Sequence, residues 1–150
     1  MLYSERRQVG LRTEIFVLCD AATDNFGKLN LLGTFDVIGV PQVPFAYPAC
    51  ALALRIRFDA LEDGEHTIRL RLIDEDGQSM GPAFEVKVMI QIPSEVSYLT
   101  HNAVFNLQQL QFPKAGEYTF ELAIDGRHED SLPLRVVIAQ PQQGSQLNPV

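Results

Sequence analysis

The stretch LIDEDGQSM, residues 72–80, groups three acidic residues just before a glycine. Carboxylates grouped in this way could bind Ca²⁺, which prefers oxygen ligands. If Asp74 takes the first position of a helix–loop–helix calcium loop, Asp76 and Glu85 fall at the ligand positions 3 and 12. However, Ser79 stands where the loop needs its glycine, and both flanks alternate as strands do.

An Asp-Gly turn is the simpler interpretation of the same residues. Asp76 and Gly77 would supply the positive φ angles of a tight reversal, with the carboxylates solvated at its rim. A second Ile-Asp strand end, followed by Gly126, has such a turn without the additional acids. We therefore expect a turn, and we keep cation binding by Asp74–Asp76 as the alternative. The sequence leaves open whether backbone N–H groups hold Asp74 as a cap of the strand.

Four arginines form the other group that could bind a ligand. Arg55 and Arg57 alternate in one strand-like segment, and Arg69 and Arg71 alternate in another. If these strands lie side by side with the same face outward, the four guanidinium groups form an anion-binding or interface patch. If the strands lie in different sheets, the patch does not exist. The alternative is pairing with glutamates on neighbouring strands, namely Glu85, Glu117 and Glu121.

The remaining reactive residue types form no recognisable catalytic motif. His66, His101 and His128 lack the spacing of zinc ligands, and we expect them at the surface or in turns. Cys19 and Cys50 lie in apolar stretches, so we expect buried, reduced thiols. The chain has neither a G-x-S-x-G elbow nor a phosphate-binding glycine loop. The sequence thus predicts no catalytic, cofactor-binding or metal-ligating residue.

The composition is that of one globular domain with excess negative charge. The 150 residues are 46% hydrophobic and 21% charged, with a net charge of −7. The positive residues are scattered, so nucleic-acid binding is not expected, because it requires a concentrated positive surface. The N-terminal region shows neither a signal peptide nor a membrane span. We therefore expect a cytoplasmic protein without membrane association.

Alternation with a period of two residues dominates the chain. In residues 50–58, five apolar side chains share one face, while alanines and arginines share the other. The pattern recurs in four later segments, 66–73, 84–90, 118–124 and 132–139. Two earlier segments, 13–22 and 28–40, are more continuously apolar, which is typical of strands covered on both faces. In residues 101–112 the apolar positions change parity, which predicts a bulge or a break near Gln108 and Gln109.

These segments predict an all-β protein, namely an immunoglobulin-like antiparallel β-sandwich of about eight strands with Greek-key connections. Tyr118 in KAGEYTF resembles the tyrosine corner of such sandwiches, with its ring buried and its hydroxyl bonded to nearby backbone. Residues 40–49 and 92–100 are expected to be long connections between the sheets. We expect a flexible N-terminal extension, a single domain and a disordered tail, with boundaries at 1–11, 12–139 and 140–150.

Several motifs taken together resemble a small bacterial family of unknown function. The motif E-x-F-x-L-C-D-A-A occupies residues 14–22, G-K-L-x-x-L-G-x-F-D occupies 27–36, and L-I-D-E-D-G occupies 72–77. The resemblance covers about residues 13–137. It implies a compact β-sandwich, and it brings no known activity, cofactor or catalytic residue.

Two functions follow from these observations. The first is a non-enzymatic binding or assembly module, which forms a homo-oligomer or binds an unknown protein partner through a sheet face or an edge strand. The second is a metal-dependent enzyme or ligand binder that uses Asp74–Asp76 together with a histidine. We favour the first because the sequence lacks a catalytic constellation.

Overall fold

The computed structural model describes residues 10–139, in which the regular structure is nine strands and one short 3-10 helix, η1 (Ala60–Glu62). The strands are β1 (Leu11–Asn25), β2 (Lys28–Phe35), β3 (Val37–Val40), β4 (Phe45–Asp59), β5 (Gly64–Ile73), β6 (Phe84–Ile90), β7 (Tyr98–Phe112), β8 (Gly116–Ile124) and β9 (Arg127–Ile138). Residues 1–9 of the expected extension and the expected tail, 140–150, lie outside the described residues, whereas Leu11 already belongs to β1. None of the helical structure within 10–139 is long and apolar enough to cross a membrane.

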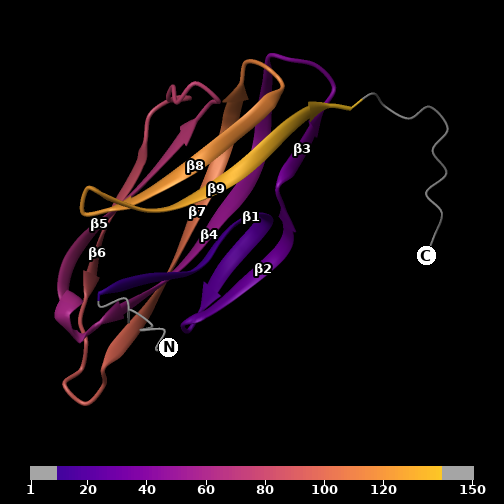
Figure 1. Cartoon of the computed structure of the whole chain (residues 1–150). Coiled ribbons are helices and arrows are strands. Elements are labelled where there is room, and N and C mark those ends of the chain that lie inside the picture. Colours follow the sequence, from indigo (N-terminus) through magenta and orange to yellow (C-terminus); the bar gives the residue numbers. More distant parts are fainter. Residues whose placement is uncertain (1–9, 140–150) are drawn as a thin grey trace, which may run out of the picture.

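The strands form two sheets that enclose one core (Figure 1). Sheet A has the order β2-β1-β4-β7, and sheet B has the order β3-β9-β8-β5-β6. Neighbouring strands are antiparallel except for β3 and β9, which are parallel. The all-β prediction is confirmed. The strand count rises because the segment expected at 28–40 divides at Asp36, where the chain leaves sheet A and enters sheet B.

The inward faces predicted from the alternation meet in the core. In the central strands β4, β5 and β8 the predicted apolar side chains are at most 4% exposed. Tyr118 is buried, and its hydroxyl donates to the carbonyl of Lys114 at 2.6 Å, which is the interaction expected of a tyrosine corner. β7 is irregular where the parity changes, because Gln109 has a φ of 53°. The pairing of β4 with β7 keeps the same register on both sides of this point, so the irregularity is a break in the strand and not a bulge.

The β1–β2 hairpin folds back over the outer face of sheet A. β1 pairs with β4 only as far as Cys19, and it then continues with β2 alone. At the tip, Nδ2 of Asn102 in β7 donates to Oδ1 of Asp24 at 2.9 Å and to the carbonyl of Gly27 at 3.1 Å. Because β4 separates β1 from β7 within the sheet, the hairpin reaches β7 by crossing the face of β4. Figure 1 shows the bend in β1 that sends the hairpin back.

Small side chains lie beneath this hairpin. Cys19, Ala51 and Ala53 face outward from sheet A, yet none is more than 1% exposed. Ala22 and Leu29 of the hairpin pack against them. Larger side chains at these positions would hold the hairpin away, so the small residues of the CDAA and ALA stretches permit the close approach.

Three expectations from the sequence are wrong in detail. The segment 28–40 is not covered on both faces, since Leu31 and Leu32 are 37% and 69% exposed. The connection expected at 40–49 is shorter, because β4 begins at Phe45 and pairs there with β7. Ile138, which was expected to face inward, is 53% exposed at the end of β9.

Candidate functional site

The two sheets are joined along one side of the sandwich and separate along the other. On the joined side the chain runs from β2, an edge of sheet A, directly into β3, an edge of sheet B (Figure 1). On the other side the edges are β7 and β6, which pair only with β4 and β5. Residues 91–97 connect β6 to β7 at one end of the sandwich. Within the described residues, the outer backbone groups of β6 and β7 therefore have no strand partner.

A groove of about 470 Å³ lies between these two edges. We call it the β6–β7 groove, and its main lining side chains are Phe84, Val86, Val88, His101, Ala103 and Phe105. Four of these, Phe84, Val88, Ala103 and Phe105, are half-buried and pack against the main core. The groove is therefore an opening through which the edge of the core can be reached from solvent.

The exposure of Val86 is the sequence-level sign of this groove. The alternation in FEVKVMI assigns Val86 to the inward face together with Phe84 and Val88, but Val86 is 37% exposed. The alternation is correct, and the exposure arises because no strand of the described chain covers the gap between β6 and β7 at this point. An inward-facing apolar residue that stays exposed indicates room for another chain.

His101 brings a titratable group into the groove. It is half-buried within β7, so the expectation of a surface or turn histidine is wrong for this residue. Burial lowers the pKa of His101, although the negative charge of Asp24 acts in the opposite direction. The lowered pKa favours the uncharged imidazole, which keeps the groove suited to apolar side chains.

The four arginines do not form one patch, because β4 belongs to sheet A and β5 to sheet B. Glu14 binds both arginines of β4: its Oε1 lies 3.2 Å from Nε of Arg55, and its Oε2 lies 2.7 Å from Nη2 of Arg57. Arg57 also lies over the ring of Tyr98, at 4.4 Å from its centroid. The expected glutamates are therefore not the partners of Arg55 and Arg57. A bulge between Thr13 and Ile15 places Glu14 here.

Two acids of the 74–76 stretch, Asp74 and Glu75, accept hydrogen bonds from backbone amides. Oδ1 of Asp74 accepts hydrogen bonds from the amides of Asp76 and Gln78, each at 2.9 Å, so Asp74 is the cap that the sequence left open. Glu75 accepts from the amide of Glu117 at 2.9 Å. The turn is confirmed, although in the Asp76-Gly77 pair only Gly77 has a positive φ. Within residues 10–139 no three His, Cys, Asp or Glu residues are grouped so that they could hold a metal ion.

His66 is buried, contrary to the expectation of a surface position. Its Nδ1 lies 2.6 Å from Oδ2 of Asp125, and its Nε2 lies 2.6 Å from the carbonyl oxygen of Glu62. Both neighbours are acceptors, so the imidazolium, with two N–H donors, satisfies them best. Burial by itself would lower the pKa of His66, but the hydrogen bonds to Glu62 and Asp125 outweigh it and raise that pKa. This group joins η1, β5 and the β8–β9 turn, and it has a structural role.

The two cysteines are buried free thiols, as predicted. Burial raises the pKa of Cys50 to about 11, and it also raises the pKa of Cys19. The reactive thiolate is therefore scarce at neutral pH for both residues.

Solved structures that resemble the fold belong to much larger proteins. The alkylpurine DNA glycosylase AlkC of Pseudomonas fluorescens, bound to DNA containing an abasic site analog, has a TM-score of 0.53 and 7% identity, over 85% of this chain and 30% of that chain. The beta-glucosidase from Listeria innocua in complex with gluconolactone has a TM-score of 0.52 and 12% identity, over 87% of this chain and 16% of that chain. At such identities the likeness concerns the fold alone.

A search of curated protein sequences finds no match. The model of a family described as a family of unknown function, DUF6941, matches residues 14–137. This range includes all three motifs on which the resemblance was based, at residues 14–22, 27–36 and 72–77. The chain therefore belongs to the family of unknown function DUF6941.

Proposed function

We propose that this protein is a non-enzymatic binding module that takes an extended segment of a protein partner into the β6–β7 groove. One observation carries the proposal: two free strand edges border an apolar groove that is continuous with the core. An extended segment placed there would form main-chain hydrogen bonds with an edge strand and direct alternate side chains into the groove.

The composition of the two edges favours β7 as the strand that receives the partner. Natural edge strands commonly carry charged side chains that prevent pairing with other chains. β6 has Glu85 and Lys87, whereas β7 contains no Asp, Glu, Lys or Arg along its fifteen residues. A partner strand would extend sheet A beyond β7, and its inward side chains would contact Phe84, Val86 and Val88 of β6.

The groove also defines the chemistry of the partner segment. The part of β7 that lines the groove runs from His101 to Asn106, so the segment needs about six residues in an extended conformation. Its inward side chains should be aliphatic, because the groove walls are mainly valine, alanine and phenylalanine. It should lack an internal proline, which would remove a backbone donor.

We also infer that the sandwich is immunoglobulin-like. The hydrogen bond of Tyr118 supports this inference, as does the packing of a four-stranded sheet against a five-stranded one. The metal-dependent alternative has less support, because the carboxylates of Asp74 and Glu75 accept backbone hydrogen bonds.

A peptide titration tests the proposal. The probe is a seven-residue peptide of alternating valine and threonine flanked by serines, and the control peptide has a proline at the central position. We expect the first peptide to shift the backbone amide NMR signals of β7 and the control peptide to leave them unchanged. The Val86→Lys variant, which places a charge in the groove, should weaken binding at least about tenfold.

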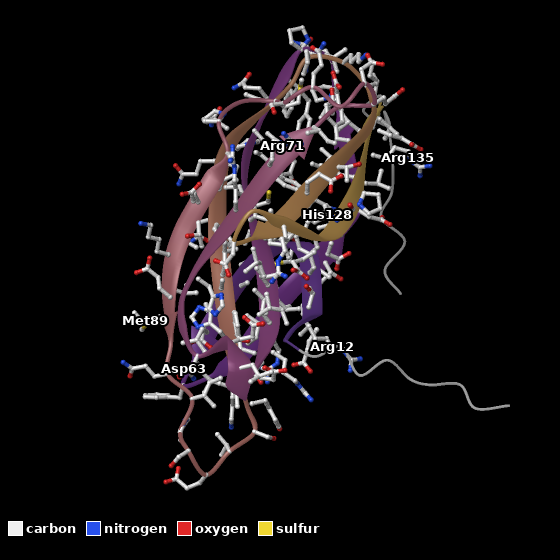
Figure 2. All side chains as sticks on the ribbon, turned by 60° about the vertical axis from the view of Figure 1, so that its left-hand side comes forward. Arg12, Asp63, Arg71, Met89, His128 and Arg135 are labelled. Carbon is white, nitrogen blue, oxygen red and sulfur yellow. The ribbon has the colours of Figure 1, made fainter. Side chains whose placement is uncertain are left out.

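Met89→Lys is the matched control, because Met89 lies on the same strand but projects from the opposite face (Figure 2). This variant should bind the peptide as the unmodified protein does. Equal binding by the Val86→Lys variant, or peptide shifts centred on β2, would contradict the proposal. Sedimentation in the absence of peptide tests whether the partner is a second copy of the chain. A dimer that the Val86→Lys variant dissociates would mean that a second copy supplies the strand.

A further inference from the structure

We propose that the outer face of sheet B holds a binding site for a small phosphorylated molecule, in which Arg69 and Arg71 contact the phosphate group and His128 lines the site. This site lies on β5, β8 and β9 and is separate from the β6–β7 groove. It does not depend on the function proposed above. Arg71 and His128 lie on the side of the molecule that faces the viewer in Figure 2.

The first observation is that Arg69 and Arg71 are free. Within the described residues, neither guanidinium has a carboxylate oxygen within 4.0 Å, whereas the two arginines of β4 share Glu14. Glu85 and Glu121 are the direct cross-strand neighbours of Arg69 and Arg71, but neither forms the expected ion pair. Two unpaired guanidinium groups, two residues apart on one strand, can approach the same anion.

Arg71 stays unpaired because Glu121 is held by other partners. Its Oε2 lies 2.6 Å from Nε2 of His128 and accepts a hydrogen bond from the hydroxyl of Ser131 at 2.7 Å. The hydroxyl of Ser131 also lies 2.9 Å from Nε2 of His128. Because one imidazole nitrogen faces both groups, these residues do not form the relay of a hydrolase, in which the two nitrogens have different partners. They fix Glu121 away from Arg71.

A β-bulge produces this arrangement. Residues three apart on a regular strand point to opposite faces, so His128 and Ser131 would not meet. The pairing of β8 with β9 shifts between Leu122 and Ala123, and Glu129 is the additional residue in β9. The bulge therefore brings His128 and Ser131 to the same face. Bulges often redirect side chains next to binding sites.

The shape of the surface provides room for a ligand. Arg69, Ala123 and His128 are direct neighbours across three strands, so the small Ala123 lies between two larger side chains. With neighbouring strands about 4.8 Å apart, the backbones of Arg69 and His128 are roughly 10 Å apart. The surface here is hollowed by about 400 Å³, with Gly126 as another small lining residue. A phosphate group fits above Ala123, within reach of the two arginines, and volumes of this order suit small ligands.

The site can contact both ends of a phosphorylated molecule that also carries hydroxyl groups. The two guanidinium groups donate to the phosphate oxygens, because the planar arrangement of their N–H donors matches the geometry of a phosphate group. Glu121 and Ser131 lie in the next row of the sheet, beside Arg71, and their oxygens can accept hydrogen bonds from ligand hydroxyls. Glu121 also disfavours any ligand that is negative throughout.

The test follows the arginine Nε–H NMR signals of the full chain during titration with phosphate at constant ionic strength, with chloride as the balancing anion. One arm uses inorganic phosphate and the other uses glucose 6-phosphate. We expect saturable shifts of the Arg69 and Arg71 signals in at least one arm. Tighter binding of the sugar phosphate would identify an ester as the ligand class, and equal binding would identify free phosphate.

Four variants make the result specific. Arg69→Gln and Arg71→Gln should each weaken binding about tenfold, because each loses charge-assisted hydrogen bonds. Arg135→Gln is the matched control, since Arg135 is exposed on the same sheet but outside the hollow (Figure 2). Glu121→Gln should tighten binding several-fold by removing a negative charge.

Glu121→Gln is expected to raise the affinity for phosphate and Arg71→Gln to lower it, so a general loss of structure would not explain both results. Shifts that never saturate, or that chloride reproduces, would overturn the site. So would an equal loss of affinity in Arg135→Gln and Arg69→Gln.

Discussion

The two sides of the sandwich differ in how the sheets meet. On the β2–β3 side one segment of chain serves both sheets, and backbone hydrogen bonds from Arg135 to Asp36 and from Ala139 to Val40, at 2.9 and 2.8 Å, hold β3 against β9. Val40 is fully buried there. On the β6–β7 side Val86 belongs to the same kind of inward face and stays 37% exposed. The difference shows that residues 10–139 cover the core with paired strands on the β2–β3 side and leave it partly open on the β6–β7 side.

The edge strands on the two sides of the sandwich also differ in length and in charge. β3 is only four residues long and ends one residue before Pro41, so it offers little to another strand. β7 is fifteen residues long and has no ionised carboxylate or basic side chain apart from His101. Where the chain leaves an edge long, uncharged and next to an apolar groove, an added strand is the partner that satisfies both the backbone and the side chains.

Replacing a valine with alanine on each side of the sandwich measures how well that side of the core is covered. Val40→Ala should lower the free energy of unfolding by about 2.5 kcal/mol, because it removes two buried methyl groups and leaves a cavity. Val86→Ala should cost less than about 1 kcal/mol, because solvent already reaches that side chain. Urea denaturation of both variants provides the comparison. Equal losses would show that the β6–β7 side is as closed as the other.

Replacing an alanine with leucine tests how much space there is beneath the β1–β2 hairpin and in the β6–β7 groove. Ala53→Leu should cost about 2 kcal/mol, because Ala53 is fully buried beneath the β1–β2 hairpin and the hairpin must lift. Hydrogen exchange should then increase in residues 21–31. Ala103→Leu places the same side chain in the β6–β7 groove and should cost little. A large loss for Ala103→Leu would mean that the groove has no room for a partner.

Alternation in the sequence predicted which side chains share a face, and it was most successful where strands have neighbours on both sides. β4, β5 and β8 are such strands, and their inward faces were predicted residue by residue. Alternation does not report whether a face is covered. Leu32 and Val86 were expected to be covered, and both lie in edge strands.

The candidate sites depended on contacts between distant parts of the chain, which the sequence does not display. The fold-back of the hairpin rests on Asn102 and Asp24, which are 78 residues apart. Likewise, the partners of His66 include Asp125, 59 residues away. The free arginines of β5 could be proposed from the sequence only as half of a four-arginine patch, because the assignment of β4 and β5 to different sheets is a property of the topology.

His66 in the interior and His101 in the groove should change the stability of the protein with pH in opposite directions. The pKa of His66 is raised in the folded protein, so its stabilisation is present below about pH 6.5 and is lost as the pH rises through the raised pKa. The pKa of His101 is lowered, so stability is lost as the pH falls from about 6.5 through the lowered pKa.

Urea denaturation between about pH 5 and pH 9 separates the two histidines. His66→Gln should flatten the alkaline side of the stability profile, and His101→Gln should flatten the acid side. A peptide bound in the groove should bury His101 further, so its affinity should decrease as the pH falls. Affinity that is independent of pH between about 5 and 7 would mean that the peptide does not cover His101.

The smallest effect is expected for Leu32→Lys. Leu32 is 69% exposed on the free edge of β2, where a lysine side chain can remain in water. Stability should change by less than about 0.5 kcal/mol, and the valine–threonine peptide should bind as before. This prediction matters because an exposed leucine on an edge strand is also a feature of interaction surfaces. If Leu32→Lys abolished peptide binding or dissociated a dimer, while Val86→Lys did neither, the interaction surface would lie on the β2 side, and the open groove would have no role in binding.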